Sequence, residues 1–290
     1  MNKLTVFTPT YNRAYTLHKC YESLKKQTCK NFEWLIIDDG SDDNTKELVE
    51  KWIDEKEFPI KYYYKENGGM HSGYNKAYEI IKTELAVCID SDDYMTNNSV
   101  ELILNFWEKN KDEKFAGIVG LNINKGGKII GKPLPNMKSM KIYDYYNRYN
   151  GSGDKKIVYR TEIIKKFISP EFKGEKLFPT CYKYFNVDLE YNMLIIHEPL
   201  GVVEYMPDGF TKNIIKQYKK NLNSFIFYRK FIMNYKNATL KHKFNSAIHY
   251  NAECWLNKER DWIEKSPKKL LTIMAIPFSL LLYVYILLRG

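Results

Sequence analysis

Cysteine is scarce in this chain and follows no pairing pattern. The five cysteines among 290 residues are odd in number and widely spaced: Cys20, Cys29, Cys88, Cys181 and Cys254. Such spacing supplies neither the ligand pairs of a structural zinc site nor the framework of a small disulfide-bonded domain. We therefore expect reduced, mostly buried thiols, as in a cytosolic protein.

The N-terminus lacks a long hydrophobic run. Its first apolar stretch, Leu4–Phe7, turns polar at Thr8 and is too short for the core of a signal peptide, so we expect no secretion. Internal repeats and low-complexity segments are also lacking. Apolar and charged fractions of 44% and 28% are typical of a globular protein and exclude general disorder.

Acidic residues are scarce in the last part of the chain. Residues 1–210 contain 30 Lys and Arg against 31 Asp and Glu, whereas residues 211–290 contain 15 against 4. The formal net charge of +10 therefore belongs to the C-terminal part. Because the basic segment Lys212–Lys243 leads into an apolar run, we expect an anionic membrane surface, and no nucleic acid, as its partner.

The apolar run Leu270–Leu288 allows more than one interpretation. As a helix its 19 residues would measure ~28 Å, just short of the ~30 Å hydrocarbon core of a bilayer. Pro277 and the short length also allow a monotopic or re-entrant insertion, and a buried core helix is the remaining alternative. If the helix spans, Lys265, Lys268 and Lys269 predict a cytosolic position for that side.

Short apolar strands alternate with amphipathic helices in the first 120 residues. The pattern predicts strands at 4–7, 34–37, 60–64, 85–89 and 117–121, and helices at 14–26, 44–52, 74–82 and 99–110. This βαβ succession predicts an α/β, Rossmann-like fold with a mostly parallel central sheet flanked by helices. Ligands of such folds bind at the carboxyl ends of the strands.

The regular pattern ends after residue 123. Gly126-Gly127 predicts a hairpin turn, and residues 132–154 form an irregular stretch rich in Pro, Met, Tyr and Gly. Strands are predicted again at 157–159, 194–196 and 202–205, with a Thr161-capped helix after the first. We expect one domain over 1–210, a basic helical segment over 211–268 and a membrane-associated helix over 269–290.

Polar side chains follow the first two predicted strands. Thr8–Arg13 supplies hydroxyls, an aromatic ring and a cation, which suit a nucleotide base and a phosphate, although a packed Tyr11 and a proline turn are the alternative. After the second strand, Asp39 can accept a hydrogen bond from a ribose hydroxyl or a pyrimidine N–H. Asp42 and Asp43 are interpreted as caps of the next helix.

A glycine-rich loop, Glu66–Gly73, follows the third strand. Paired glycines allow close backbone approach, and the N-terminus of the next helix attracts phosphate. No chemical role is assigned to His71. Closely spaced glycines are missing after the first strand, which excludes a nucleotide-cofactor dehydrogenase.

The fourth strand runs directly into Asp90-Ser91-Asp92-Asp93. Carboxylates crowded at the end of a hydrophobic strand repel one another unless a cation compensates. Mg²⁺ or Mn²⁺ prefers a few carboxylate oxygens together with the oxygens of a diphosphate. Capping of the next helix would explain Asp93 but not all three carboxylates.

In this order, the motifs resemble the family 2 inverting glycosyltransferases of the GT-A fold. The resemblance rests on Thr8–Arg13, Ile37–Ser41, Asn67-Gly68-Gly69 with Asn75, and Asp90–Asp93; it covers residues 3–120 and extends more weakly to about 215. It implies that Thr8, Tyr11 and Asp39 hold uracil and ribose, that Asp90 contacts ribose or sugar, and that Asp92, with Asp90, ligates Mg²⁺ or Mn²⁺. The remaining residues expected at the nucleotide-sugar site are Pro9, Arg13, Asn67, Gly69 and Ser91.

One position departs from the family pattern. Relatives usually carry an acidic pair at the start of a helix that precedes a Glu-Pro-Leu strand end, but Thr180-Cys181 stands at the aligned position, before Glu198-Pro199-Leu200. We expect Glu175, preferred to Asp188, as the base that takes the acceptor's proton. An ordinary surface acid is the alternative for each.

The resemblance implies transfer of a hexose or N-acetylhexosamine from a UDP-sugar to a hydroxyl of a lipid-linked or cell-surface polysaccharide precursor. Residues 1–120 would bind the nucleotide sugar, and residues 121–210, with the loop 132–154, would face the acceptor. The basic and apolar C-terminal part would keep the protein at the cytoplasmic face of the cell membrane, peripherally or through a C-terminal anchor. Because the acidic pair is missing, a non-catalytic sugar-nucleotide-binding partner in a glycan-assembly complex is the alternative function.

Overall fold

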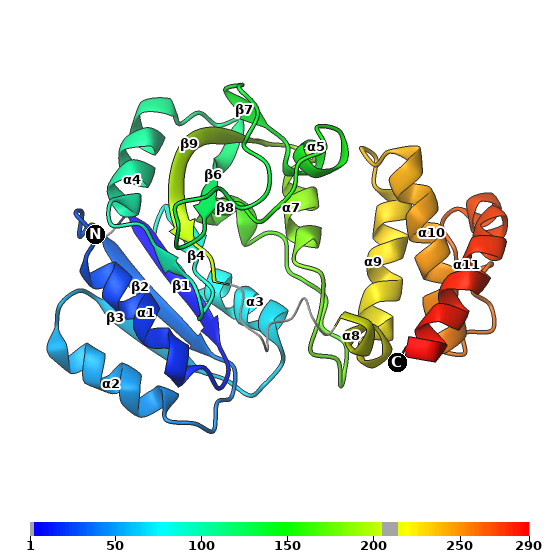
Figure 1. Cartoon of the computed structure of the whole chain (residues 1–290), viewed down its shortest axis with the longest axis horizontal. Coiled ribbons are helices and arrows are strands. Elements are labelled where there is room, and N and C mark those ends of the chain that lie inside the picture. The colour runs from blue at the N-terminus through cyan, green and yellow to red at the C-terminus, as the bar shows by residue number, and fades with distance from the viewer. Residues whose placement is uncertain (1–2, 205–213, 290) are drawn as a thin grey trace. The chain divides into compact units, whose positions relative to one another are not determined.

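The chain forms two compact units. The computed structural model describes residues 3–204 and 214–289. One unit comprises Met1–Ile168 with Lys183–Met206, and the other comprises Ser169–Tyr182 with Pro207–Gly290 (Figure 1). The predicted boundary between residues 210 and 211 and the predicted strand end at Tyr205 lie outside the described residues, as does Lys212. Residues 169–182, which we expected in the first domain, belong to the second unit.

The first unit is built on one mixed sheet, which has nine strands in the described residues. These are β1 (Leu4–Thr10), β2 (Phe32–Asp38), β3 (Ile60–Tyr64), β4 (Leu85–Cys88), β5 (Tyr94–Met95), β6 (Phe115–Ile123), β7 (Ser139–Met140), β8 (Lys156–Arg160) and β9 (Asn192–Val202). Their order is β3-β2-β1-β4-β8-β6-β9-β5, with β7 beside β9. Strands β3, β2, β1 and β4 are parallel, whereas β8 runs antiparallel to both β4 and β6.

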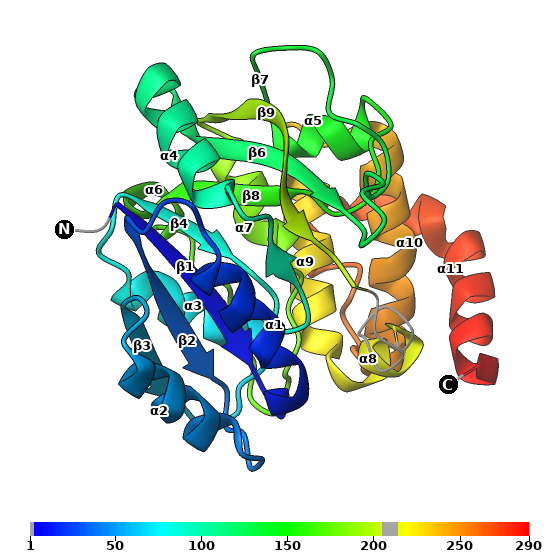
Figure 2. The same cartoon turned by 60° about the vertical axis from the view of Figure 1, so that its left-hand side comes forward.

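Helices cover both faces of this sheet. The helices that contribute to the first unit are α1 (Ala14–Lys25), α2 (Thr45–Glu55), α3 (Met70–Ile80), α4 (Ser99–Asn110), α5 (Ile142–Asn147), α6 (Thr161–Ile164) and α7 (Cys181–Val187). Buried residues of α1, α2 and α4 form a hydrophobic cluster on one face, and those of α3, α5 and α6 form a cluster on the other. Figure 2 shows α1 in front of β1 and β2, with α3 behind them.

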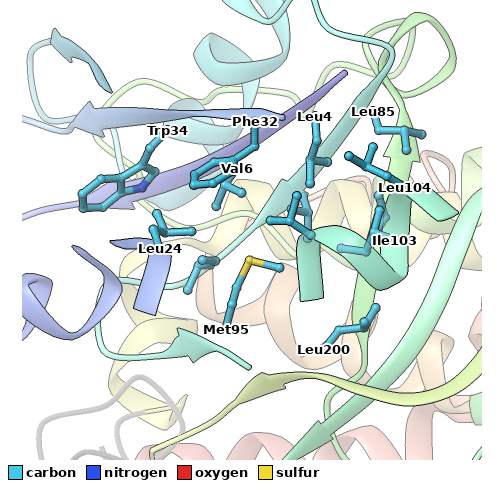
Figure 3. Packing of buried hydrophobic residues seen from close by; sticks show 14 of the residues in the cluster. Leu4, Val6, Leu24, Phe32, Trp34, Leu85, Met95, Ile103, Leu104 and Leu200 are labelled. Carbon is cyan, nitrogen blue, oxygen red and sulfur yellow. The ribbon is translucent and has the colours of Figure 1, made fainter. Parts of the chain in front are cut away.

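Alternation along β1 divides its side chains between the two clusters. Leu4 and Val6 pack with Trp34 in the first cluster (Figure 3). Phe7 packs in the second cluster against Tyr74. A strand that is buried on both faces in this way needs apolar residues at successive positions, as the sequence has here. Burial on both faces fixes each strand in the sheet. The carboxyl ends of the parallel strands therefore stay in a fixed order at one edge.

The regular first part of the chain agrees with the predicted pattern, and the later part differs. Helix α3 begins at Met70, four residues before the predicted start, because Gly69 has φ 89° and lets the chain turn directly into the helix. The irregular stretch 132–154 contains β7 and α5. The strand predicted at 194–196 is part of the longer β9, in which register shifts in the pairing with β6 accommodate Pro199. The strand predicted at 202–205 overlaps β9 at Val202 alone among the described residues.

The second unit is helical in its described part. Its helices are α8 (Ile214–Lys220), α9 (Leu222–Asn234), α10 (Leu240–Leu256) and α11 (Lys269–Arg289). Helices α9, α10 and α11 lie side by side, with α10 in the middle (Figure 1). A buried ion pair joins Arg229 on α9 to Glu253 on α10 at 3.2 Å, so a charged contact as well as an apolar core holds these helices together.

Gly117 provides a test of the sheet geometry. Its φ is 149°, and a Cβ there would lie 2.0 Å from the backbone oxygen of Val158 on the neighbouring strand. We expect Gly117→Ala to lower the free energy of unfolding by roughly 3 kcal/mol, since backbone cannot yield as a side chain can. Thermal and denaturant unfolding measure this. The matched control, Gly126→Ala, meets nothing nearer than 3.4 Å and should unfold like the wild type.

Candidate active site

The turn after β1 is tied to the turn after β2. Asn12, with φ 52°, donates its backbone N–H to Ser41 Oγ at 2.9 Å, and its Oδ1 accepts the backbone N–H of Asp42 at 2.9 Å. Tyr11 is 48% exposed at this edge, and the half-buried Arg13 immediately precedes α1. The exposed ring of Tyr11 is therefore available to a ligand at the strand ends, whereas the Arg13 guanidinium lies over the ring of Tyr15, 5.6 Å from its centroid.

Thr8 turns its side chain into the core. Its side chain is fully buried on the same face of β1 as Leu4 and Val6, and its Oγ1 accepts the indole N–H of Trp34 at 3.0 Å. The hydroxyl thus satisfies a buried indole, which speaks against its use by a nucleotide, while the place of Thr8 at the nucleotide site stays a prediction. Pro9, on the other face, lies against Gly73 of α3.

Asp39 organises the glycine-rich loop. Its buried carboxylate accepts the backbone N–H groups of Gly68 at 3.0 Å and Gly69 at 2.7 Å, and the ammonium of Lys65 at 2.6 Å. The Asn67 side chain in turn donates to the backbone oxygen of Asp39 at 2.7 Å. A charge-assisted cluster of this kind fixes the loop relative to β2. The pyrimidine contact of Asp39 stays a prediction, as does the placement of Asn67 and Gly69 at a nucleotide site.

The acidic turn after β4 divides its side chains between solvent and core. Asp90 is exposed, and Ser91 and Asp92 are half-buried. Asp93 points inward, where its Oδ1 accepts the backbone N–H of Glu204 at 3.1 Å. Burial raises the pKa of Asp93 to about 7, although Lys156 opposes the shift. Two carboxylates, Asp90 and Asp92, thus remain accessible to a ligand.

Two buried side chains beneath this turn were not expected from the sequence. Cys20 on α1 donates its Sγ–H to the backbone oxygen of Asp93 at 3.0 Å, and Lys156 on β8 donates to that of Cys88 at 3.2 Å. Lys156 therefore places a positive charge under the acidic residues. Strand pairing brings it there from 63 or more positions away in the chain, so no local pattern indicates it.

Glu204 fixes the exit of the chain from β9. Its two carboxylate oxygens pair with Lys19 of α1 at 2.8 Å and with Lys125 of the hairpin at 2.9 Å. The pKa of Glu204 is lowered because these two ammonium groups outweigh its burial. Together with the bond to Asp93, this places the last described residue of the first unit directly beside the acidic turn.

A buried lysine closes the irregular loop 132–154. Lys155 donates to the backbone oxygens of Ile130 at 2.7 Å, Ser152 at 3.0 Å and Gly153 at 3.3 Å. Its ammonium also lies 5.4 Å from the ring centroid of Tyr145, whose hydroxyl donates to Lys132 and Ser152. The two ends of the loop are therefore held together by one cation.

Asp188 does not have the surroundings of a base. Its carboxylate is fully buried and accepts the backbone N–H groups of Ile142 at 3.0 Å and Tyr143 at 2.6 Å, at the start of α5. Burial raises its pKa to about 7, a value that would suit proton transfer, although the two N–H groups oppose the shift. A carboxylate without exposed surface cannot meet an acceptor hydroxyl, so the geometry speaks against this assignment.

Glu175 is likewise engaged as a cap. In the second unit, its Oε1 accepts the backbone N–H of Asn223 at 2.8 Å and its Oε2 accepts that of Ser224 at 2.7 Å, at the start of α9. Carboxylates at this position satisfy N–H groups that have no partner within the helix. The geometry therefore supports a structural role for Glu175 rather than the expected catalytic one. At the aligned acidic position, Cys181 donates to the hydroxyl of Tyr228 at 3.1 Å.

The Asp188→Asn variant separates a cap from a base. Because an amide accepts with only one of its two terminal atoms, we expect one backbone N–H of α5 to lose its partner, at a cost of about 1–3 kcal/mol in unfolding free energy. Thermal unfolding should show the loss, while activity per folded molecule stays near that of the wild type. Loss of activity at an unchanged melting temperature would instead identify a base.

The clasp of Asp39 on the glycine loop is also testable. In Asp39→Asn the side-chain NH₂ group would face one of the donors Lys65, Gly68 and Gly69 and could not accept from it. We therefore expect backbone hydrogen exchange at the two glycines to become roughly tenfold faster. The exposed Asp42, whose Asp42→Asn variant should leave that exchange unchanged, is the control. Equal protection in both variants would contradict the clasp.

Curated relatives match parts of this chain. An uncharacterized glycosyltransferase of Rickettsia felis is 37% identical over 128 residues, which are 44% of this chain and 21% of that protein. The chondroitin synthase of Pasteurella multocida is 32% identical over 127 residues, 44% of this chain and 13% of that enzyme. The chain thus spans about a fifth or less of the length of these relatives.

The fold and the family follow from two further comparisons. A structure of S. aureus TarS residues 1–349 in complex with UDP-GlcNAc superimposes with a TM-score of 0.62 at 19% identity, over 94% of this chain and 79% of that one. The expected GT-A fold is therefore confirmed. The model of glycosyl transferase family 2 matches residues 5–167, more than half of the chain. The chain therefore belongs to glycosyl transferase family 2.

Proposed function

We propose that this protein transfers a hexose or N-acetylhexosamine, with inversion, from a UDP-sugar to a hydroxyl of a lipid-linked or cell-surface polysaccharide precursor. The observation that carries the proposal is the shared edge of parallel strands β2, β1 and β4. In register, this edge aligns Thr10 with Asp38 and Phe7 with Cys88, so the turns that follow the three strands are neighbours. Ligands of open α/β sheets bind at such an edge.

The residues at this edge support a nucleotide diphosphate. Tyr11 offers an exposed ring for a base, and the loop held by Asp39 leads into the N-terminus of α3 through Gly68 and Gly69. Because Asp39 accepts the N–H groups of both glycines, the dipole of α3 is what would favour phosphate there. UDP as the nucleotide is supported by the complex of TarS with UDP-GlcNAc.

Asp90 and Asp92 fit a divalent cation. Both side chains are accessible on one turn, and within the residues that the structure describes no group of three or more His, Cys, Asp or Glu side chains is placed to hold a metal alone. Mg²⁺ or Mn²⁺ suits such a site because it takes part of its ligands from substrate phosphates. When bound, the ion would neutralise charge on the departing diphosphate.

The acceptor is proposed from the relatives and from the C-terminal part. Chondroitin synthase, by its name, makes a polysaccharide. The one described helix that is long and apolar enough to cross a membrane, by length and composition, is Lys269–Leu288, and residues 211–290 carry a net charge of +11. Both features favour work at the cytoplasmic face of the membrane, where lipid-linked precursors are available.

The same geometry gives weight to the second candidate, a non-catalytic sugar-nucleotide-binding partner in a glycan-assembly complex. Thr180 and Cys181 replace the acidic pair of relatives, and both carboxylates expected as the base cap helices. Nucleotide binding without turnover on any acceptor, unaffected by Glu175→Gln and Asp188→Asn, would favour this candidate over the enzyme.

Nucleotide release tests the proposed reaction. The protein is incubated with UDP-hexoses and UDP-N-acetylhexosamines, Mg²⁺ or Mn²⁺ and membrane lipid extract, and free UDP is measured. We expect turnover that EDTA abolishes and that Asp92→Asn lowers about 100-fold or more, since charge on the leaving group is then uncompensated. Asp112→Asn, at an exposed acid that follows α4, is the matched control. Full turnover in EDTA or in Asp92→Asn would exclude the metal-dependent reaction.

A further inference from the structure

Helix α11 has an inverted distribution of polarity. The residues that it turns toward the protein include Thr272, Ala275 and Ser279, which are fully buried. The residues that it turns outward are large and apolar: Leu270 is 72% exposed, Leu281 73% and Leu288 82%. A helix made for water places its apolar side chains inward and its hydroxyls outward. The outward face of α11 is therefore made for an apolar surrounding.

Hydrogen bonds hold the inward face of α11 to α10. Asn251 Nδ2 donates to the backbone oxygen of Thr272 at 2.9 Å and to Ser279 Oγ at 3.1 Å, and Ser279 Oγ–H donates to the backbone oxygen of Ala275 at 2.8 Å. The buried hydroxyls of Thr272 and Ser279 are thus satisfied by Asn251 of α10, by Ser266 and within α11 itself. If lipid took the place of α10, the buried hydrogen-bonding groups that Asn251 satisfies would lose this partner.

Ring contacts extend this attachment along both helices. Phe244 near the start of α10 meets Phe278 edge-on at 5.7 Å, and Trp255 near its end meets Tyr283 at 5.8 Å. α10 also carries Lys241, Lys243 and Glu253, the last paired with Arg229 of α9. If α11 crossed a bilayer, it would draw these charges into hydrocarbon, at a cost of about 2.5–3.5 kcal/mol for each charged residue.

We propose that α11 lies in the plane of the membrane surface. The exposed apolar side chains between Leu270 and Leu288 lie among the lipid headgroups and upper acyl chains, and α10 lies on the water side. This inference rests on the membrane association proposed above. It decides between a helix that spans the bilayer and a monotopic insertion, which the sequence left open. An in-plane helix of this kind sinks only about 5–10 Å into a bilayer.

Charge at the start of α11 identifies the lipid. Lys265, Lys268 and Lys269 are exposed within five positions at this end. Two of them pair with Glu259 and Glu264, but exposed pairs of this type hold their charges weakly and can exchange for lipid phosphates. The segment as a whole keeps its large positive excess. We therefore expect preference for anionic over zwitterionic lipid.

Vesicle flotation tests the surface. The full chain is mixed with vesicles of phosphatidylcholine, with or without phosphatidylglycerol, and the floated fraction is measured. We expect flotation with anionic vesicles and an approximately tenfold weaker partition for Leu281→Asp. Ile53→Asp, at an exposed apolar residue of α2 in the first unit, is the control and should float like the wild type. No flotation of the wild type, or equal loss in both variants, would overturn the surface.

A second readout tests the orientation. A C-terminal tag is added, and protease is applied outside intact vesicles that carry the bound protein. An in-plane helix leaves the tag accessible and is released by alkaline carbonate. A protected tag with resistance to carbonate would overturn the in-plane position while leaving membrane association intact. Neither readout depends on sugar transfer, so a failure of the proposed reaction stays distinguishable.

Sedimentation velocity addresses the competing occupant, a second copy of this chain. We expect a monomer, or an assembly that Leu281→Asp does not change. If Leu281→Asp dissociated a dimer and left flotation unaltered, the outward face would be a protein interface and the inference would be wrong.

Discussion

A single buried carboxylate holds together the edge of the first unit at which β2 ends. Asp39 ends the line of β2 and gathers two backbone N–H groups and one ammonium from the loop that follows β3. An ionised carboxylate in such a place is stable only while its donors stay in position. The loop and the adjoining helix thus depend on the same few hydrogen bonds, and the backbone N–H of Asp39 in addition joins the end of β1 through the oxygen of Thr10. A site at this edge is formed in advance of any ligand.

The strands and helices of the first 120 residues could be predicted because each carries its own local signal. Helix α4 has the predicted bounds, Ser99–Asn110, and the motifs after β1, β2 and β4 meet at one edge as parallel strands require. The inward position of Thr8 was also within reach of the sequence. It shares its parity along β1 with Leu4 and Val6, and a strand directs alternate side chains to the same face. The motif resemblance compares residue types and carries no information on the direction of a side chain.

Long-range partners could not be predicted. Asp188 caps a helix that begins 46 positions earlier, and Glu175 caps one that begins 47 positions later. From the sequence alone, neither residue can be told from an unengaged acid near a glycosyltransferase site. For the same reason the position of Lys156 beneath the acidic turn could not be predicted. For α11, composition identified an apolar helix, but only the contacts of α10 show which of its faces is turned toward the protein.

The grip of Lys155 on three backbone oxygens has a consequence for variation among related chains. One ammonium joins the backbone oxygens of Ile130, Ser152 and Gly153, so the two ends of the segment between them are already held together. Closing a longer loop adds little entropic cost once its ends are fixed, because that cost grows only with the logarithm of length. Insertions in the irregular parts of this segment, outside β7 and α5, can therefore accumulate without disturbing the sheet. The fold in this way separates the edge that follows β1, β2 and β4 from a segment whose irregular parts tolerate a change in length.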